Sequence, residues 1–151
     1  MALETGGGGA AARDEGAAAA LSVLIVDDDD FVRDSTRLVL ESVGGDGRLS
    51  IEEAADGEEA LQKLPSHGPF DLVLMDAQMP FMDGFECIRR LRAWEQARVL
   101  DGHAPRRARA IAISGNADDP GFLSEALGAG FDEAIVKPLM AARAKSLLAV
   151  T

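Results

Sequence analysis

The sequence predicts an α/β fold in which five strands alternate with five helices along a single chain. Two observations carry this prediction. From Leu21 onward, short apolar runs of strand length alternate with longer segments whose apolar residues recur at helical spacing. Segments that contain glycine or proline separate the two kinds of run, as turns do. With 151 residues, 47% of them apolar, the chain is long enough for one domain with its own core.

Each element is expected from its local pattern. The expected strands are residues 22–26, 49–54, 71–76, 109–114 and 133–136. The expected helices are residues 30–43, 57–64, 84–97, 121–130 and 139–150. In the first helix, Phe31, Leu38 and Val39 recur at helical spacing. The second helix is expected to end at Pro65, because proline interrupts the helical hydrogen-bond ladder.

The apolar patterns also predict the order of the strands. Residues 71–76 are apolar on both faces, as in a central strand, whereas residues 49–54 alternate apolar and acidic, as at a sheet edge. Both placements fit a flavodoxin-like (βα)5 fold, a parallel sheet of order 2-1-3-4-5 with helices on both faces. In that order, ligands bind at the switch point between strands 1 and 3.

Residues 1–20 differ in composition from the rest of the chain. They are mainly glycine and alanine and lack the bulky apolar side chains that could offset the entropy of ordering. We expect a disordered tail over residues 1–20, with a short alanine-rich helix as the alternative, and a folded domain over residues 21–151. With three acidic residues and one basic residue, the tail does not resemble a presequence.

Composition excludes several classes of partner. The formal net charge of −11 argues against nucleic acid or an anionic membrane as the main partner. No apolar run approaches the roughly 20 residues of a membrane span. The single cysteine, Cys87, cannot form an intrachain disulfide and is expected to be a partly buried helix thiol. A cytoplasmic location is expected.

Polar residues end four of the five strands. Asp27 and Asp28 follow the first strand, Asp76 ends the third, Ser114 the fourth and Lys137 the fifth. The carboxyl ends of parallel strands share one edge of the sheet, so these side chains are expected to converge at the switch point. Clustered carboxylates suit Mg²⁺, which often bridges to phosphate, and a lysine opposite them would neutralise a phosphoryl group.

Four consecutive aspartates, Asp27 to Asp30, need compensation for their mutual repulsion. A metal would relieve the repulsion between Asp27 and Asp28. Asp29 or Asp30 is expected to cap the first helix, because aspartate is a favoured N-cap residue.

Four motifs together resemble a response-regulator receiver domain. They are "LIVDDDD", "DLVLMDAQMPFMDGFE", "AIAISGNA" and "AIVKPL", and each spans the end of an expected strand. The resemblance extends from about Leu21 to Val150, and "EAADGEEAL" also resembles the family's second strand and helix. One motif alone would mean little, but all four in order are a specific signal of a two-component or phosphorelay protein.

The resemblance implies a role for each site residue. Asp76 corresponds to the phosphoacceptor, which takes a phosphoryl group from the phosphohistidine of a sensor histidine kinase or a histidine phosphotransfer protein. Asp28 and Asp76 would ligate Mg²⁺ directly, Asp27 mostly through water, and Gln78 through its backbone carbonyl. The resemblance implies a signalling domain rather than an enzyme, with only self-catalysed phosphotransfer and autodephosphorylation, and it leaves the downstream effector open.

The resemblance also implies how the signal leaves the site. Ser114 corresponds to the switch hydroxyl and Lys137 to the lysine that binds a phosphoryl oxygen, followed by a cis bond at Pro138. The family often has an aromatic residue where this chain has Ala134. Unless Phe131 replaces that ring, rearrangement is expected only in the loop that follows Ser114.

Two other readings of the site remain open. A haloacid-dehalogenase-like phosphatase would use Asp27 as its nucleophile, but it leaves Asp76 in "MDAQMP" without a role. A pseudo-receiver would only bind partners. The presence of every charged site residue argues against this interpretation.

Several residues outside the site have simpler interpretations. Trp94 is expected to pack on its helix, and His67 and His103 are expected in a turn and a loop, without a phosphorelay role. The basic segment around Arg106, within residues 99–108, is interpreted as a solvated loop, with docking to an acidic partner as the alternative.

Overall fold

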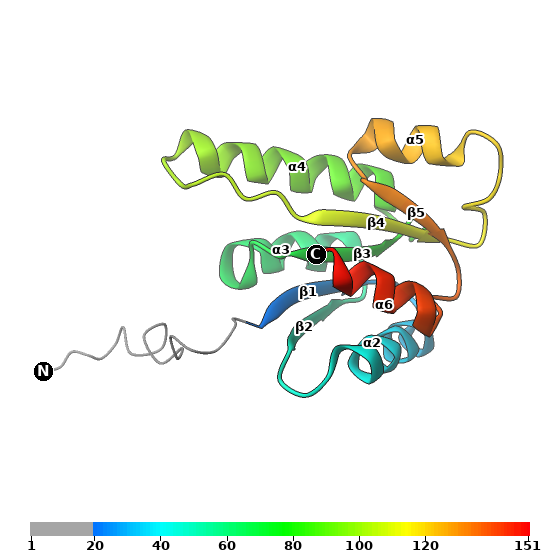
Figure 1. Ribbon diagram of the computed structural model, residues 1–151. Helices are drawn as coiled ribbons and strands as arrows, with labels where there is room; N and C mark the ends of the chain where they lie inside the picture. Colours follow the sequence, from blue (N-terminus) through cyan, green and yellow to red (C-terminus); the bar gives the residue numbers. More distant parts are fainter. Residues whose placement is uncertain (1–19) are drawn as a thin grey trace, which may run out of the picture.

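Five parallel strands form one sheet in the order β2-β1-β3-β4-β5 (Figure 1). The structure is a computed structural model and describes residues 20–151. The tail expected at residues 1–20 therefore lies outside the described residues, apart from Ala20. The strands are β1 (Leu21–Val26), β2 (Leu49–Ala54), β3 (Leu72–Asp76), β4 (Arg109–Ser114) and β5 (Glu133–Val136). The helices are α2 (Asp30–Gly44), α3 (Gly57–His67), α4 (Gly84–Leu100), α5 (Phe122–Ala129) and α6 (Ala141–Ala149).

Helices cover both faces of the sheet, as the apolar patterns predicted. Helices α2 and α6 pack together on one face, and α3, α4 and α5 lie on the other (Figure 1). Alternate residues of the central strands enter two separate cores: Val23, Ile25 and Leu74 face α2 and α6, while Leu24 and Met75 face the other layer. All five residues of β3 are buried, which confirms its central position, and β2 is the half-exposed edge strand.

Three helix predictions need correction. Helix α3 continues past Pro65 to His67, because the proline removes only its own N–H and the Gly68 N–H still donates to the Leu64 carbonyl at 3.0 Å. Helix α4 runs to Leu100 instead of ending near residue 97. In α2, two of the three residues expected on the apolar face point outward instead of toward the core. Phe31 and Leu38 are exposed, while Thr36 and Leu40, one turn apart, face the core.

Aspartate side chains begin the helices that follow β1 and β3. The Asp29 carboxylate accepts hydrogen bonds from the backbone N–H groups of Phe31 and Val32, at 2.9 and 3.3 Å. It is therefore Asp29, of the two candidates, that caps α2, as a favoured N-cap residue does. Asp83 caps α4 in the same way, through the Glu86 N–H at 2.9 Å. These caps fix the directions in which both chain segments leave the sheet edge.

Among residues 20–151, no helix is both long and apolar enough to cross a membrane.

Glycine at position 84 allows α4 to start against the end of β3. The Gly84 N–H donates to the Ala77 carbonyl at 2.9 Å, which closes the loop that follows Asp76. A Cβ atom at Gly84 would lie 2.4 Å from the Asp76 carbonyl oxygen and 2.8 Å from the Ala77 Cα. Both neighbours are backbone atoms of a buried strand end, so they cannot move aside as a flexible side chain would.

We therefore predict that Gly84→Ala lowers the free energy of unfolding by about 1–3 kcal/mol, the usual cost of overpacking. The measurement is urea denaturation of both proteins in EDTA. Gly128→Ala is the matched control, because an added Cβ there meets no atom within 4 Å and position 128 lies inside α5. The control should be neutral or stabilised by up to about 1 kcal/mol. Equal stabilities for the two variants would contradict the close-packing argument.

Candidate functional site

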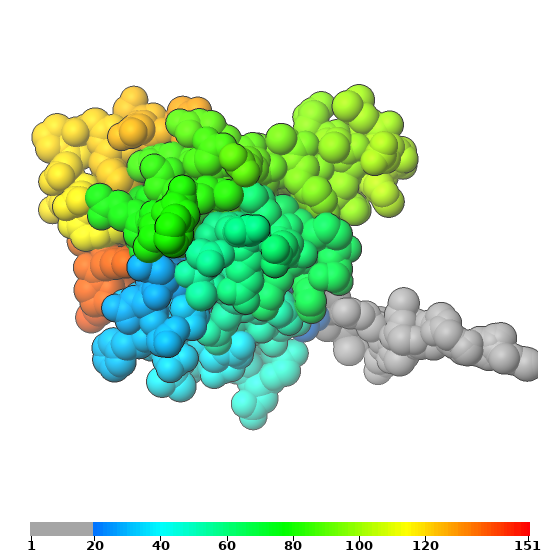
Figure 2. Space-filling model, turned by 180° about the vertical axis from the view of Figure 1, so that it is seen from behind, coloured from blue at the N-terminus to red at the C-terminus, as the bar shows by residue number. Residues whose placement is uncertain are grey.

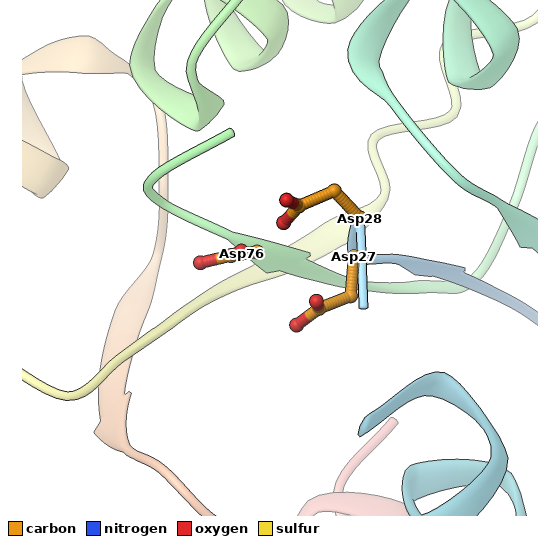
Figure 3. A group of neighbouring side chains, drawn as sticks. All are labelled: Asp27, Asp28 and Asp76. Atoms are coloured by element: carbon orange, nitrogen blue, oxygen red, sulfur yellow. The ribbon is translucent and has the colours of Figure 1, made fainter. Parts of the chain in front are cut away.

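The ends of β1 and β3 bring three carboxylates together. Asp27 and Asp28 follow the last residue of β1, and Asp76 is the last residue of β3. One carboxylate oxygen from each of the three lies within 4.8 Å of the others. Figure 3 shows the three side chains extending from these adjacent chain segments toward a common space. The structure thus assembles the acidic cluster that the strand-end pattern predicted.

Lys137 lies against the buried part of this cluster. Its Nζ is 3.1 Å from the Asp27 Oδ2 and 3.4 Å from the Asp76 Oδ1. The side chains of Asp27 and Asp76 are only 6% and 5% exposed, whereas Asp28 is exposed. One ammonium group therefore lies beside two of the three clustered carboxylates, so the cluster retains an excess of negative charge.

Backbone N–H groups hold the two buried carboxylates in place. The Asp29 N–H donates to the Asp27 Oδ1 at 2.9 Å, and the Gln78 N–H donates to the Asp76 Oδ1 at 3.1 Å. Each bond links an aspartate to the residue two positions later, so the turn after each strand also orients the carboxylate. Hydrogen bonds to the ionised form partly offset the cost of burying the charge.

The pKa of Asp76 is raised from 3.8 to about 6, mainly by burial and also by the negative charge of Asp27. The Gln78 hydrogen bond and the charge of Lys137 act in the opposite direction. For Lys137, burial lowers the pKa, but hydrogen bonding and attraction to Asp27 and Asp76 raise it above its usual value overall. The cluster therefore has enough uncompensated negative charge to attract another cation.

The donor set fits Mg²⁺. All three clustered side chains offer carboxylate oxygens, which a hard divalent cation prefers, and the exposed Asp28 leaves one side of the cluster open to solvent. The buried Asp76 carboxylate is incompletely compensated without a further positive charge. The backbone carbonyl of Gln78 remains a predicted ligand, because the structure gives it no contact that tests this role.

Ser114 ends the strand next to β3, with its side chain buried. Its Oγ accepts a hydrogen bond from the Asn116 N–H at 3.0 Å, and its carbonyl accepts one from the Lys137 N–H at 3.0 Å. The hydroxyl is therefore tied to the following loop, and the strand ends that carry Ser114 and Lys137 are tied to each other. The bond between Lys137 and Pro138 is cis, as expected.

Arg33 belongs to the site's surroundings, although the sequence did not single it out. Its Nη1 donates to the Asp27 backbone carbonyl at 2.8 Å, and its Nε lies 3.3 Å from a Glu53 carboxylate oxygen. The side chain is largely buried between α2 and β2. In the sequence, the only sign of this role was an arginine one turn into the helix that follows the acidic run. The role of Arg33 becomes clear only when the fold places Glu53 of β2 beside the end of β1.

The position expected for an aromatic switch has a different environment. Ala134 is partly buried and packs against the larger core cluster, as Ala117 does. Phe131 is buried and meets the Phe85 ring edge-on, with centroids 6.2 Å apart. Phe122 also packs on Phe85, at 5.7 Å. Phe131 is thus a core residue, held in an aromatic cluster beneath α4 and α5.

The remaining single-residue predictions are largely structural. Trp94 packs against the core, with the Arg98 guanidinium over its ring at 5.1 Å. Cys87 is fully buried, not partly buried as predicted, and burial raises the pKa of its thiol to about 12. His67 belongs to the last turn of α3, not to a separate turn, and His103 is exposed in a loop, as expected.

The basic loop before β4 is neutralised within the chain. Arg106 forms an ion pair with Asp71 at 2.5 Å, and Arg107 forms one with Asp132 at 2.7 Å. Both arginines that made this segment look like a docking site therefore already have acidic partners. This favours the interpretation as a solvated loop.

Comparison with known proteins gives the same assignment. The family model of the response regulator receiver domain matches residues 23–149. The chain is 32% identical over 100 residues, 66% of its length, to hybrid signal transduction histidine kinase A of Dictyostelium discoideum, of which it covers 4%. Among solved structures, Vibrio cholerae chemotaxis protein CheY4 has a TM-score of 0.72 and 27% identity, covering 87% of this chain and 98% of that one.

A further solved structure shares the fold. It is the complex of the Saccharomyces cerevisiae histidine phosphotransfer protein Ypd1 with the receiver domain of Ssk1, with a TM-score of 0.67, 22% identity and 80% coverage of each chain. The chain spans 4% to 43% of the lengths of the first curated relatives it matches. Taken with the strand order and the strand-end residues, the family match over residues 23–149 means that the chain belongs to the response regulator receiver domains of two-component and phosphorelay signalling.

Proposed function

We propose that the chain accepts a phosphoryl group on Asp76 from the phosphohistidine of a sensor histidine kinase or a histidine phosphotransfer protein. The carrying observation is the convergence of Asp76 with Asp27, Asp28 and Lys137 at neighbouring strand ends. Hybrid kinases among the relatives are consistent with such a donor. The role of phosphorylation is to change how the domain binds partners.

The transfer is a displacement at phosphorus. An Asp76 carboxylate oxygen forms the new P–O bond as the P–N bond to the histidine breaks, and the released imidazole takes up a proton. The buried position of Asp76 keeps the nucleophile poorly solvated, and the Gln78 N–H holds one of its oxygens in a fixed direction. The product is an aspartyl phosphate, which water later hydrolyses.

Lys137 and Ser114 act on the transferred group. Lys137 already lies 3.4 Å from an Asp76 oxygen, so a short side-chain movement suffices for it to pair with a phosphoryl oxygen. The Ser114 hydroxyl, which now accepts from the Asn116 N–H, would turn to donate to the phosphoryl group. That rotation would release the backbone of the loop after β4. Ala134 offers no ring to rotate, so the change is confined to that loop and α5.

Mg²⁺ is the expected cofactor. Asp28 and Asp76 would hold it, with Asp27 nearby through water and the Gln78 carbonyl completing the protein ligands. When bound, the ion stabilises negative charge on the phosphoryl group. The chain's own contribution is the position of the carboxylates, which Lys137, Arg33 and the two turn N–H groups maintain.

The first prediction about the site concerns the nucleophile. With labelled acetyl phosphate and Mg²⁺, the wild-type chain should acquire hydroxylamine-labile label, and Asp76→Asn should lose it to background while remaining folded. Asp46→Asn, an exposed turn aspartate at the opposite edge of the sheet, is the control and should label normally. A peptide map that places the label on Asp27 would instead favour phosphatase-like chemistry. No label on the wild-type chain would favour a pseudo-receiver.

The second prediction follows from the pKa of Asp76. A carboxyl whose folded pKa is raised from 3.8 to about 6 makes the folded state less stable as pH rises through that interval. Without divalent cations, Asp76→Asn should therefore exceed the wild type in unfolding free energy by about 3 kcal/mol at pH 7. The difference should shrink to about 0.5 kcal/mol near pH 4, where the folded state is fully protonated at Asp76 and the unfolded state is only partly protonated.

Urea denaturation in EDTA between pH 4 and pH 8 measures this difference. Asp46→Asn should stay within about 0.5 kcal/mol of the wild type throughout, as ordinary surface substitutions do. A difference for Asp76→Asn that does not change with pH would mean that the substitution acts through packing and not through the charge.

The third prediction concerns the metal. Mg²⁺ should raise the melting temperature of the wild-type chain, because a ligand that binds only the folded state stabilises it. Asp28→Ala removes an exposed carboxylate without disturbing the core, so the variant should fold normally and lose most of that rise. Titration of the melting temperature with Mg²⁺ tests this, with Asp46→Ala as control. An undiminished rise in Asp28→Ala would exclude Asp28 from the ligands.

A further inference from the structure

A largely buried arginine joins the acidic cluster to the edge strand of the sheet. In Figure 2, α2, in blue, forms part of the surface of the molecule, but the side chain of Arg33 in this helix is only 14% exposed. Its Nε donates to the Glu53 Oε1 at 3.3 Å, and its Nη1 donates to the Asp27 backbone carbonyl at 2.8 Å. Its Nη2 pairs with the exposed Asp30 at 2.5 Å. One guanidinium therefore holds acceptors from the end of β1, from β2 and from the start of α2.

Glu53 holds this arginine from the side of β2. Its Oε1 accepts from Arg33, and its Oε2 accepts from the Arg37 Nε at 2.6 Å. Hydrogen bonding to Arg37, and then to Arg33, lowers the pKa of Glu53, against the opposite effect of burial. Glu53 therefore stays ionised near neutral pH, and charge-assisted hydrogen bonds of this kind are stronger than neutral ones. The guanidinium of Arg33 has little freedom to leave its position.

The Asp27 carbonyl is part of the peptide group that leads into Asp28. Because a peptide group is planar, a hydrogen bond that fixes its oxygen also fixes the position of the next Cα atom. The Asp27 side chain already has partners of its own, Lys137 and the Asp29 N–H. The Asp28 side chain, in contrast, is exposed. The bond from Arg33 therefore constrains the backbone from which the exposed carboxylate of the cluster extends.

The charge and the position of Arg33 have opposite effects on a cation at the cluster. A guanidinium beside the carboxylates repels a divalent ion, so by charge alone its removal should strengthen binding. As a support for the Asp27 backbone, the same side chain should strengthen binding when it is present. Groups that orient metal ligands in this way commonly change metal affinity by about 10- to 100-fold. The sign of the change on removal of Arg33 therefore distinguishes the two effects.

We infer that Arg33 and Glu53 are positioning residues for the Mg²⁺ site, with Glu53 acting through Arg33 and Arg33 acting through the Asp27 backbone. This inference rests on the proposed function, since it concerns the metal of the same site. Neither residue contacts the transferred group. They determine where Asp28 lies, so β2, which supplies none of the three clustered carboxylates, contributes to metal binding.

Urea denaturation at a series of Mg²⁺ concentrations measures two quantities for each chain. The unfolding free energy in EDTA reports the stability of the domain, and its rise with added Mg²⁺ gives the dissociation constant of the ion. The variants are Arg33→Gln, Glu53→Gln and the double variant. The control is Glu52→Gln, which removes the same charge from the neighbouring residue of β2, where the carboxylate pairs with Lys63.

We expect Arg33→Gln to raise the Mg²⁺ dissociation constant about tenfold and Glu53→Gln to raise it about threefold to tenfold. The double variant should match Arg33→Gln, because Glu53 acts through Arg33. Glu52→Gln should stay within about twofold of the wild type, as a partly exposed and screened charge does. Glu53→Gln keeps a hydrogen-bonding side chain of the same shape, so it tests the inference even if Arg33→Gln does not fold.

Three results would overturn the inference. One is a loss of stability in EDTA with an unchanged dissociation constant, which is what a purely structural role predicts. Another is tighter Mg²⁺ binding by Arg33→Gln, as the loss of its charge alone predicts. The third is an equal effect of Glu53→Gln and Glu52→Gln. If the stability of the wild-type chain does not rise with Mg²⁺, the metal role in the proposed function is refuted and this inference with it.

Discussion

Mutual repulsion among three carboxylates is the constraint on which the rest of the site depends. The pairing of Val26 with Met75 in the parallel sheet brings the next residues, Asp27 and Asp76, side by side, and Asp28 completes the cluster. Two like charges at this distance cannot both be ionised without compensation. The chain supplies an ammonium group from β5 and N–H groups from two turns, and Arg33 fixes the backbone of Asp27.

These groups compensate the negative charge of the cluster only in part, and the remaining charge favours the binding of a cation. A fully neutralised cluster would bind neither a divalent cation nor the positive end of any partner group. Here the pKa of Asp76 remains raised, mainly by burial, so an added cation would stabilise the ionised site. Under the proposed function, a phosphoryl group would then be held among positive charges. Rigid support keeps the charges from moving apart: β3 is buried along its whole length, and the start of α4 closes against it at Gly84.

The sequence was sufficient for the features that local patterns encode. Five apolar runs gave the strands, and a polar residue at the end of a run was enough to place Asp76, Ser114 and Lys137 at one sheet edge. Features that depend on a partner distant in sequence were not accessible. Arg33 became a site residue only through β2, and the outward direction of Phe31 only through the packing of α2 on α6.

The side chains near the site also differ in how they could take part in signal output. Ala134 is small and partly buried, while Phe131 is locked against Phe85 in the core, so neither can move between buried and exposed positions as a free ring would. The Ser114 hydroxyl, in contrast, is joined to the Asn116 backbone, and Gly115 between them has open space around it. In the proposed switch, movement of the hydroxyl would therefore reach the surface through the backbone of this loop, and α5, whose first residue Phe122 packs on Phe85, is the next helix along the chain.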